Sequence, residues 1–200
     1  MWARGAAIRP VPEYAKIDAR LLEQVERDLS DTTDAVRVDL DAAFVRFEST
    51  QPQLSDRVTS VLGRPLDETA LALGYFLAIA VWLAFERAFP DRLDEVTEEA
   101  LKATEDALAL EEELRASHSE EPLEIDDVVA QEQPALIDFV HGHLEAALEG
   151  KDDEPREVDI DDVHLVYRTV LVLALALSHA VRAPGGDGSG IKPRNDEMMA

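Results

Sequence analysis

The chain has 200 residues, 43 acidic and 19 basic side chains, a formal net charge of −24 and no cysteine. The lack of cysteine excludes disulfides, thiolate catalysis and cysteine-ligated zinc, and it suits a reducing compartment, so we expect a cytoplasmic protein. The negative field disfavours nucleic acid and anionic membranes as partners and favours a basic protein surface. The charge is concentrated in residues 91–162, which hold 26 acidic and 5 basic residues.

Two amphipathic helices are predicted at the start of the chain. Residues 15–30 carry apolar side chains four apart, which is one stripe at helical spacing. Residues 34–48 carry a second stripe of the same kind. The stripes consist of Ile17, Leu21, Val25 and Leu29, and of Val36, Leu40, Phe44 and Phe47.

Residues 69–85 and 169–181 differ from the other segments because they are apolar on every side. A helix of this kind is either buried in a protein core or placed in a membrane. The runs are short for a bilayer span, and acidic residues flank them instead of the lysines and arginines that orient membrane helices. We therefore predict two central buried helices, with a membrane hairpin as the alternative.

Residues 91–115 carry a narrow apolar stripe with steps of three and four, and acidic residues cover the rest of the helix. This spacing is typical of packing against one or two neighbouring helices, or of a coiled-coil contact with another chain. The stripe consists of Leu93, Val96, Ala100, Ala103, Ala107, Leu110 and Leu114.

Two further helices are expected at 123–132 and 136–148. Residues 183–200 have the glycine-rich, polar composition of a flexible tail. The chain therefore predicts a single all-α domain over residues 1–182.

A motif occurs twice in the chain. Residues 51–58 read QPQLSDRV and residues 133–140 read QPALIDFV. The two apolar segments also align, at an offset of 94 instead of 82, with the 12 extra residues falling in the charged loop 148–160. We therefore predict a helical bundle built from two duplicated units, at about 15–90 and 91–184. A pseudo-twofold axis between them would bring the two apolar helices together.

The Gln-Pro steps favour a helix break, since proline suits the first position of a new helix. The glutamine amide is expected to bond the carbonyls that the break frees. An alternative is a paired polar site at the pseudo-twofold axis, formed by Gln51, Asp56, Gln133, Asp138 and His141. His141 and Glu145 are four residues apart, so their side chains could share a metal on one face of a helix.

No catalytic motif, metal motif or phosphate-binding loop is recognisable, so we predict no cofactor and no catalytic residue. The favoured function is a non-enzymatic acidic module for assembly or regulation, acting on a basic protein partner or forming a homo-oligomer. The alternative is a helical bundle that binds a small molecule or a metal between the units, and such a bundle could be an enzyme.

Overall fold

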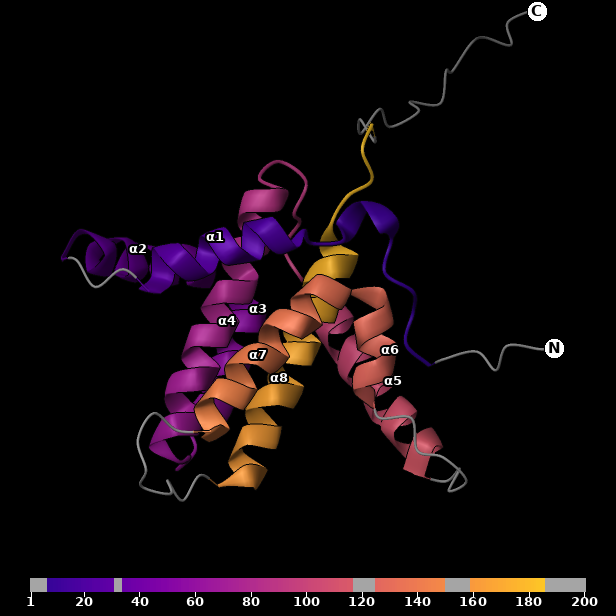
Figure 1. The fold of residues 1–200 in the computed structure, drawn as a ribbon. Helices are drawn as coiled ribbons and strands as arrows, with labels where there is room; N and C mark the ends of the chain where they lie inside the picture. The colour runs from indigo at the N-terminus through magenta and orange to yellow at the C-terminus, as the bar shows by residue number, and fades with distance from the viewer. Residues whose placement is uncertain (1–6, 31–33, 117–124, 150–158, 186–200) are drawn as a thin grey trace, which may run out of the picture.

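The computed structural model describes residues 7–30, 34–116, 125–149 and 159–185, and this part of the chain is all-helical, as predicted. It contains no β-strand and forms eight packed α-helices after one short 3₁₀ helix (Figure 1). These elements are η1 (Glu13–Ala15), α1 (Ala19–Ser30), α2 (Asp34–Thr50), α3 (Pro52–Leu62), α4 (Glu68–Ala88), α5 (Glu98–Ala116), α6 (Ile125–Glu132), α7 (Pro134–Glu149) and α8 (Ile160–Ala180).

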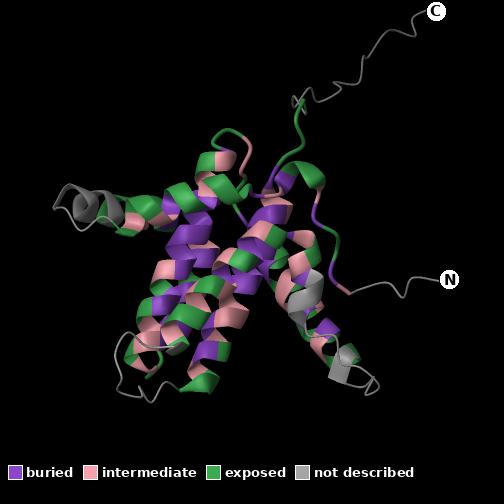
Figure 2. Ribbon diagram, in the orientation of Figure 1, coloured by how far each residue is buried: buried purple, intermediate pink, exposed green. Residues whose placement is uncertain are grey.

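Helices α4 and α8 are long and strongly apolar, and they pack against each other. Each begins at an aspartate whose carboxylate accepts hydrogen bonds from the backbone of the first turn, Asp67 for α4 and Asp159 for α8. Such a cap stabilises a helix by about 1 kcal/mol. Residues Leu77–Phe85 and Val170–Ser178 are buried without a break, as Figure 2 shows for the middle of the molecule. By length and composition alone both helices could cross a membrane, and 67% and 61% of their most apolar windows are buried inside the protein.

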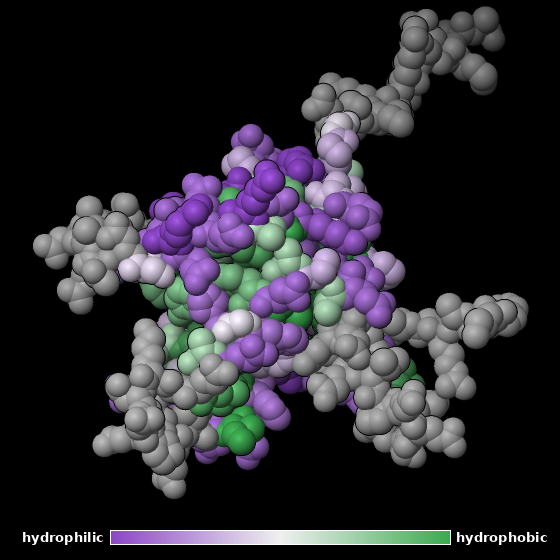
Figure 3. Space-filling model, in the orientation of Figure 1, coloured by the Kyte–Doolittle hydropathy of each residue, from purple (hydrophilic) through white to green (hydrophobic). Residues whose placement is uncertain are grey.

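Helices α1, α2, α3, α5 and α7 pack on α4, on α8 or on both. Helix α1 packs on α4 and α7, and α5 packs on α8, α3 and α6. Figure 1 shows α1 and α2 running across one end of α4, while α5 diverges from α8 on the other side. Hydrophilic residues cover the end where α1 crosses, and hydrophobic residues appear between the helices below it (Figure 3).

Two predicted helices begin later than expected. Ile17 is buried, but it lies in an extended segment ahead of α1, which starts at Ala19. Leu93 pairs with Val181 in an isolated antiparallel bridge, and α5 starts only at Glu98. In the segments ahead of α1 and α5, backbone groups make long-range hydrogen bonds instead of helical ones. Most of the predicted tail, residues 186–200, and most of the loop 148–160 lie outside the described residues.

Candidate functional site

Gln51 is the single residue between α2 and α3, and Pro52 takes the first position of α3. Gln51 is only 2% exposed. Nε2 donates to the Asp94 carbonyl at 3.0 Å, and Oε1 accepts from the Val96 N–H at 2.9 Å. The amide therefore pairs with the backbone ahead of α5 much as a neighbouring strand would. We call this arrangement the Gln51 clamp.

Gln133 occupies the matching place between α6 and α7, and it is fully buried. Nε2 donates to the Ala15 carbonyl at 2.9 Å, and Oε1 accepts from the Ile17 N–H at 3.1 Å. Nε2 also donates to Ser178 Oγ at 2.8 Å, and Ser178 Oγ itself donates to the Ala174 carbonyl. We call this arrangement the Gln133 clamp, and it joins α7, α8 and the segment ahead of α1.

The glutamines bond segments far away in the sequence instead of the carbonyls freed by the helix break. The expected local role of the amides is therefore wrong, although the predicted breaks at Gln51 and Gln133 are confirmed. Each clamp bonds the carbonyl of one residue and the N–H of the residue two further on. This pattern needs both the donor and the acceptor of an amide.

The other three candidate residues have different surroundings. Asp56 and Asp138 are exposed, whereas both glutamines are buried, so the structure does not gather the five residues into one buried site. His141 is half-buried, and its Nε2 lies 2.9 Å from the Tyr167 hydroxyl. Within the described part of the chain, no group of three or more His, Asp or Glu side chains could hold a metal ion.

Residues 7–17, the N-terminal segment, are held mainly through their backbone. Glu111 accepts from the Ala7 N–H at 2.8 Å, and Glu132 accepts from the Val11 N–H at 2.6 Å. His179 Nε2 lies 3.1 Å from the Arg9 carbonyl, to which it donates. Burial and the Arg9 charge lower the pKa of His179, so the neutral ring is favoured.

Four partners of this segment were not predicted from the sequence, and these are Glu111, Glu132, Ser178 and His179. One signal was available for Ser178, a hydroxyl close to the end of an otherwise apolar run, because a buried hydroxyl needs a partner. Nothing in the spacing of the two glutamates distinguished them from their exposed neighbours.

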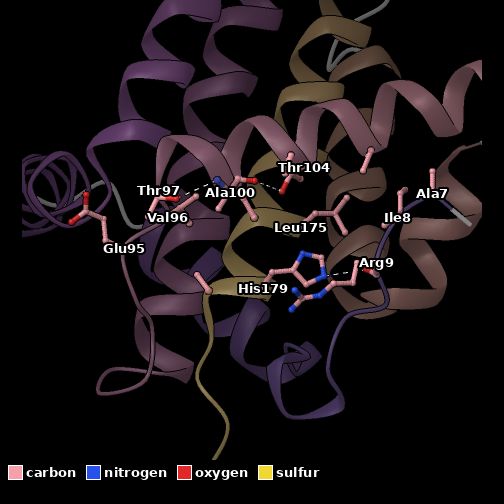
Figure 4. Close-up of a pocket in the computed structure, with 14 residues that line it drawn as sticks. Ala7, Ile8, Arg9, Glu95, Val96, Thr97, Ala100, Thr104, Leu175 and His179 are labelled. Atoms are coloured by element: carbon pink, nitrogen blue, oxygen red, sulfur yellow. Dashed lines mark hydrogen bonds between the residues drawn. The ribbon is translucent and has the colours of Figure 1, made fainter. Parts of the chain in front are cut away.

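A cavity of ≈ 350 Å³ lies between the N-terminal segment, α5 and the end of α8, and we call it the α5 groove. Figure 4 shows Thr97, directly ahead of α5, and Ala100 and Thr104 of α5 on one side, with Arg9 and His179 across from them. Most of the lining is apolar, and it includes Ile8, Ala103, Ala107 and Leu175.

Only part of the predicted apolar stripe of residues 91–115 faces the core. The buried positions of α5 are Leu101, Leu108 and Glu111, on a neighbouring face. Ala100 and Ala103 are exposed, and Leu110 is 49% exposed. Helix α5 therefore has two apolar faces, one used by the fold and one open to the groove.

A second histidine lies among aromatic rings on another side of the molecule. His143 contacts the edges of Phe76 and Phe139, with ring centroids 4.7 and 4.5 Å away, and its Nε2 lies 3.5 Å from Glu26. Burial lowers the pKa of His143, and Glu26 opposes that shift. These contacts tie α7 to α1 and α4, and they give no nucleophile or acid–base pair.

Comparisons of the chain with protein-family models, with curated proteins and with solved structures found no match to any of them.

Proposed function

We propose that this protein is a non-enzymatic helical module that acts through contacts with another protein, in the cytoplasm. The observation that carries the proposal is the exposed apolar face of α5. A stripe with coiled-coil spacing, including Ala100, Ala103 and Leu110, lies open beside a groove instead of facing the core. Apolar surface of this kind is typical of interaction sites.

The charge of α5 supports a protein partner. Residues 98–116 hold seven acidic and two basic residues, for a net charge of −5. Such a surface attracts a basic protein and repels the phosphates of nucleic acids and anionic lipids.

The test is site-specific photo-crosslinking in the native cell. A photoreactive amino acid at Ala103, in the groove, should yield a discrete adduct with another protein. The matched control places it at Ala109, which is exposed on a different face of the same helix. Equal adducts from the two positions would refute the proposal. An adduct with a small molecule at Ala103 would instead favour the alternative, a ligand-binding bundle.

We also infer that the chain arose by duplication of one four-helix unit. The two central helices are then α4 from the first unit and α8 from the second. The clamps support this idea because they are reciprocal. Gln51 of the first unit holds the segment ahead of α5, and Gln133 of the second unit holds the segment ahead of α1. The packing is reciprocal too, since α3 contacts α8 and α5 while α7 contacts α4 and α1.

The helix caps refine the alignment of the proposed units. Asp67 and Asp159 both cap helices of 21 residues, so the helix starts are 92 residues apart. The sequence match instead pairs Asp67 with Asp161, an offset of 94. Asp162 Oδ2 accepts from the Asp67 N–H at 2.6 Å, so the beginnings of α4 and α8 are joined directly.

A further inference from the structure

The open face of α5 carries a heptad pattern of charge as well as of apolar residues. Taking Ala100, Ala107 and Leu114 as one core position of the heptad, and Val96, Ala103 and Leu110 as the other, the position before the first is acidic each time. These acidic residues are Glu99, Asp106 and Glu113, and all three are exposed. They border the apolar stripe on one side, where a coiled-coil partner places its own charged row. We call them the acidic row.

The groove beside the stripe has room for side chains larger than those of α5. Within α5 the core positions at the groove are the alanines Ala100, Ala103 and Ala107, and the cavity next to them is ≈ 350 Å³. Leu175 forms part of its floor, and Arg9 and His179 lie on the opposite wall (Figure 4). Leucine-sized side chains from a partner helix would fill this space. The partner would need basic residues only along the flank that meets the acidic row.

A second copy of the chain is a poor occupant. If two α5 helices paired in antiparallel fashion, the acidic rows would face each other and repel. In a parallel pair the acidic row would meet the position after Ala103 and Leu110, which is taken by Thr104 and Glu111. Neither of these residues is basic, and Glu111 is buried and accepts from the Ala7 N–H. The charge pattern therefore favours a different chain.

We infer that the α5 groove binds a helix of another protein that has a leucine-rich face and a row of lysines or arginines along the flank that meets Glu99, Asp106 and Glu113. This inference rests on the proposed function and adds the chemistry of the partner. Binding buries the partner's leucines against Ala100, Ala103 and Leu175, and the basic row forms ion pairs along α5.

The test uses the full-length protein and two fluorescent helical peptides. Both peptides have three heptads with leucine at the core positions, and the flanking positions are all lysine in one and all glutamate in the other. In fluorescence anisotropy the lysine peptide should bind at least about tenfold more tightly, with an affinity that falls as salt rises. Equal affinities for the two peptides, or no binding of the lysine peptide, would overturn the inference.

Matched variants separate the groove from general attraction to an acidic protein. Replacing the row by Glu99→Gln, Asp106→Asn and Glu113→Gln should weaken binding of the lysine peptide about five- to tenfold. The control removes the same three side-chain types from exposed positions of α1 and α2 by Glu23→Gln, Asp41→Asn and Glu48→Gln. An equal loss in the control would mean that net charge alone attracts the peptide, and the inference would fail.

A second pair of variants tests the apolar contact. Ala103→Glu blocks the groove, so the lysine peptide should bind about tenfold more weakly despite the added negative charge. Ala109→Glu adds the same charge outside the groove and should leave binding unchanged or slightly stronger. If Ala103→Glu strengthens binding, the groove is not the site.

The proposed function can survive the failure of this inference. A protein adduct at Ala103 in the cell, together with peptides that bind equally, would mean that α5 has a partner of other chemistry. Selective binding of the lysine peptide without any cellular adduct at Ala103 would instead count against the proposed function.

Discussion

The two clamps perform the same task in different surroundings. Gln51 makes two long-range hydrogen bonds, to Asp94 and Val96, and the Asp94 carbonyl is only partly buried. Gln133 makes three, to Ala15, Ile17 and Ser178, and every group involved is buried. The same Gln-Pro step therefore gives two junctions of unequal strength, and the one that secures the start of the chain is the more enclosed.

This difference follows from what precedes each clamped segment. The segment held by Gln51 continues directly from α4, and backbone bonds to the end of α8 also secure it, from Asp94 N to the Ala180 carbonyl and from Arg182 N to the Arg92 carbonyl. The segment held by Gln133 follows the start of the chain and depends on side chains of α5, α6 and α8. The Gln133 clamp consequently has less backbone support beside it.

The largest expected effect tests whether the two proposed units are equivalent at their centres. Leu77 of α4 and Leu171 of α8 are buried, at 0% and 1% exposure. An aspartate at either place would be an unpaired buried charge costing several kcal/mol, a large part of a typical stability of about 5–15 kcal/mol. Leu77→Asp and Leu171→Asp should both unfold or aggregate in thermal melts. A wild-type melting temperature for either variant would remove that helix from the core and would count against the duplication.

The clamps themselves should give the next largest effects. Gln133→Leu leaves buried backbone groups of Ala15 and Ile17 without partners and should cost about 3 kcal/mol, while Gln51→Leu should cost about 2 kcal/mol. Urea unfolding monitored by circular dichroism measures both. If Gln51→Leu is the more destabilising variant, the ranking of the two junctions drawn above is wrong.

A surface ion pair should matter far less than either clamp. Glu112 of α5 is part of such a pair, since its Oε1 accepts from Arg168 Nε of α8 at 2.8 Å. Both side chains are more than a third exposed, so Glu112→Ala should cost about 0.5 kcal/mol. Urea unfolding at low and high salt is the measurement. A loss above about 2 kcal/mol would show that the pair is essential for the docking of α5.

The smallest effect concerns pH and the N-terminal segment. Burial lowers the folded-state pKa of His179 below 6.5, so the unfolded chain takes up the proton first. The stability that the neutral His179 ring contributes is therefore complete above pH 6.5. It is lost as the pH falls from 6.5 through the pKa of His179 in the folded protein. We expect a small decrease in melting temperature over that range, measured relative to His179→Gln at each pH. A difference between the two proteins that grows towards low pH in favour of wild type would contradict this sign.

Helical periodicity predicted most of the elements but not the face that each helix buries. The all-α fold and the helix breaks at Gln51 and Gln133 follow from apolar spacing and proline chemistry. Helix α5 illustrates the limit, because its sequence offers two apolar faces and only packing against α8 selects the one with Leu101 and Leu108. The clamps could not be predicted from local rules, since their partners lie 43 to 118 residues away.

The way the N-terminal segment is held has a consequence for synthesis on the ribosome. Ala7, Arg9 and Val11 are bonded by Glu111, His179 and Glu132, and each of these partners lies 104 to 170 residues further along the chain. At about 5–20 residues per second, the first residues wait on the order of 10–30 s before His179 is even translated. During that interval α4 has already left the exit tunnel without α8 to cover it. We therefore expect the nascent chain to be a strong chaperone client, and its native structure to form only once α8 has left the exit tunnel.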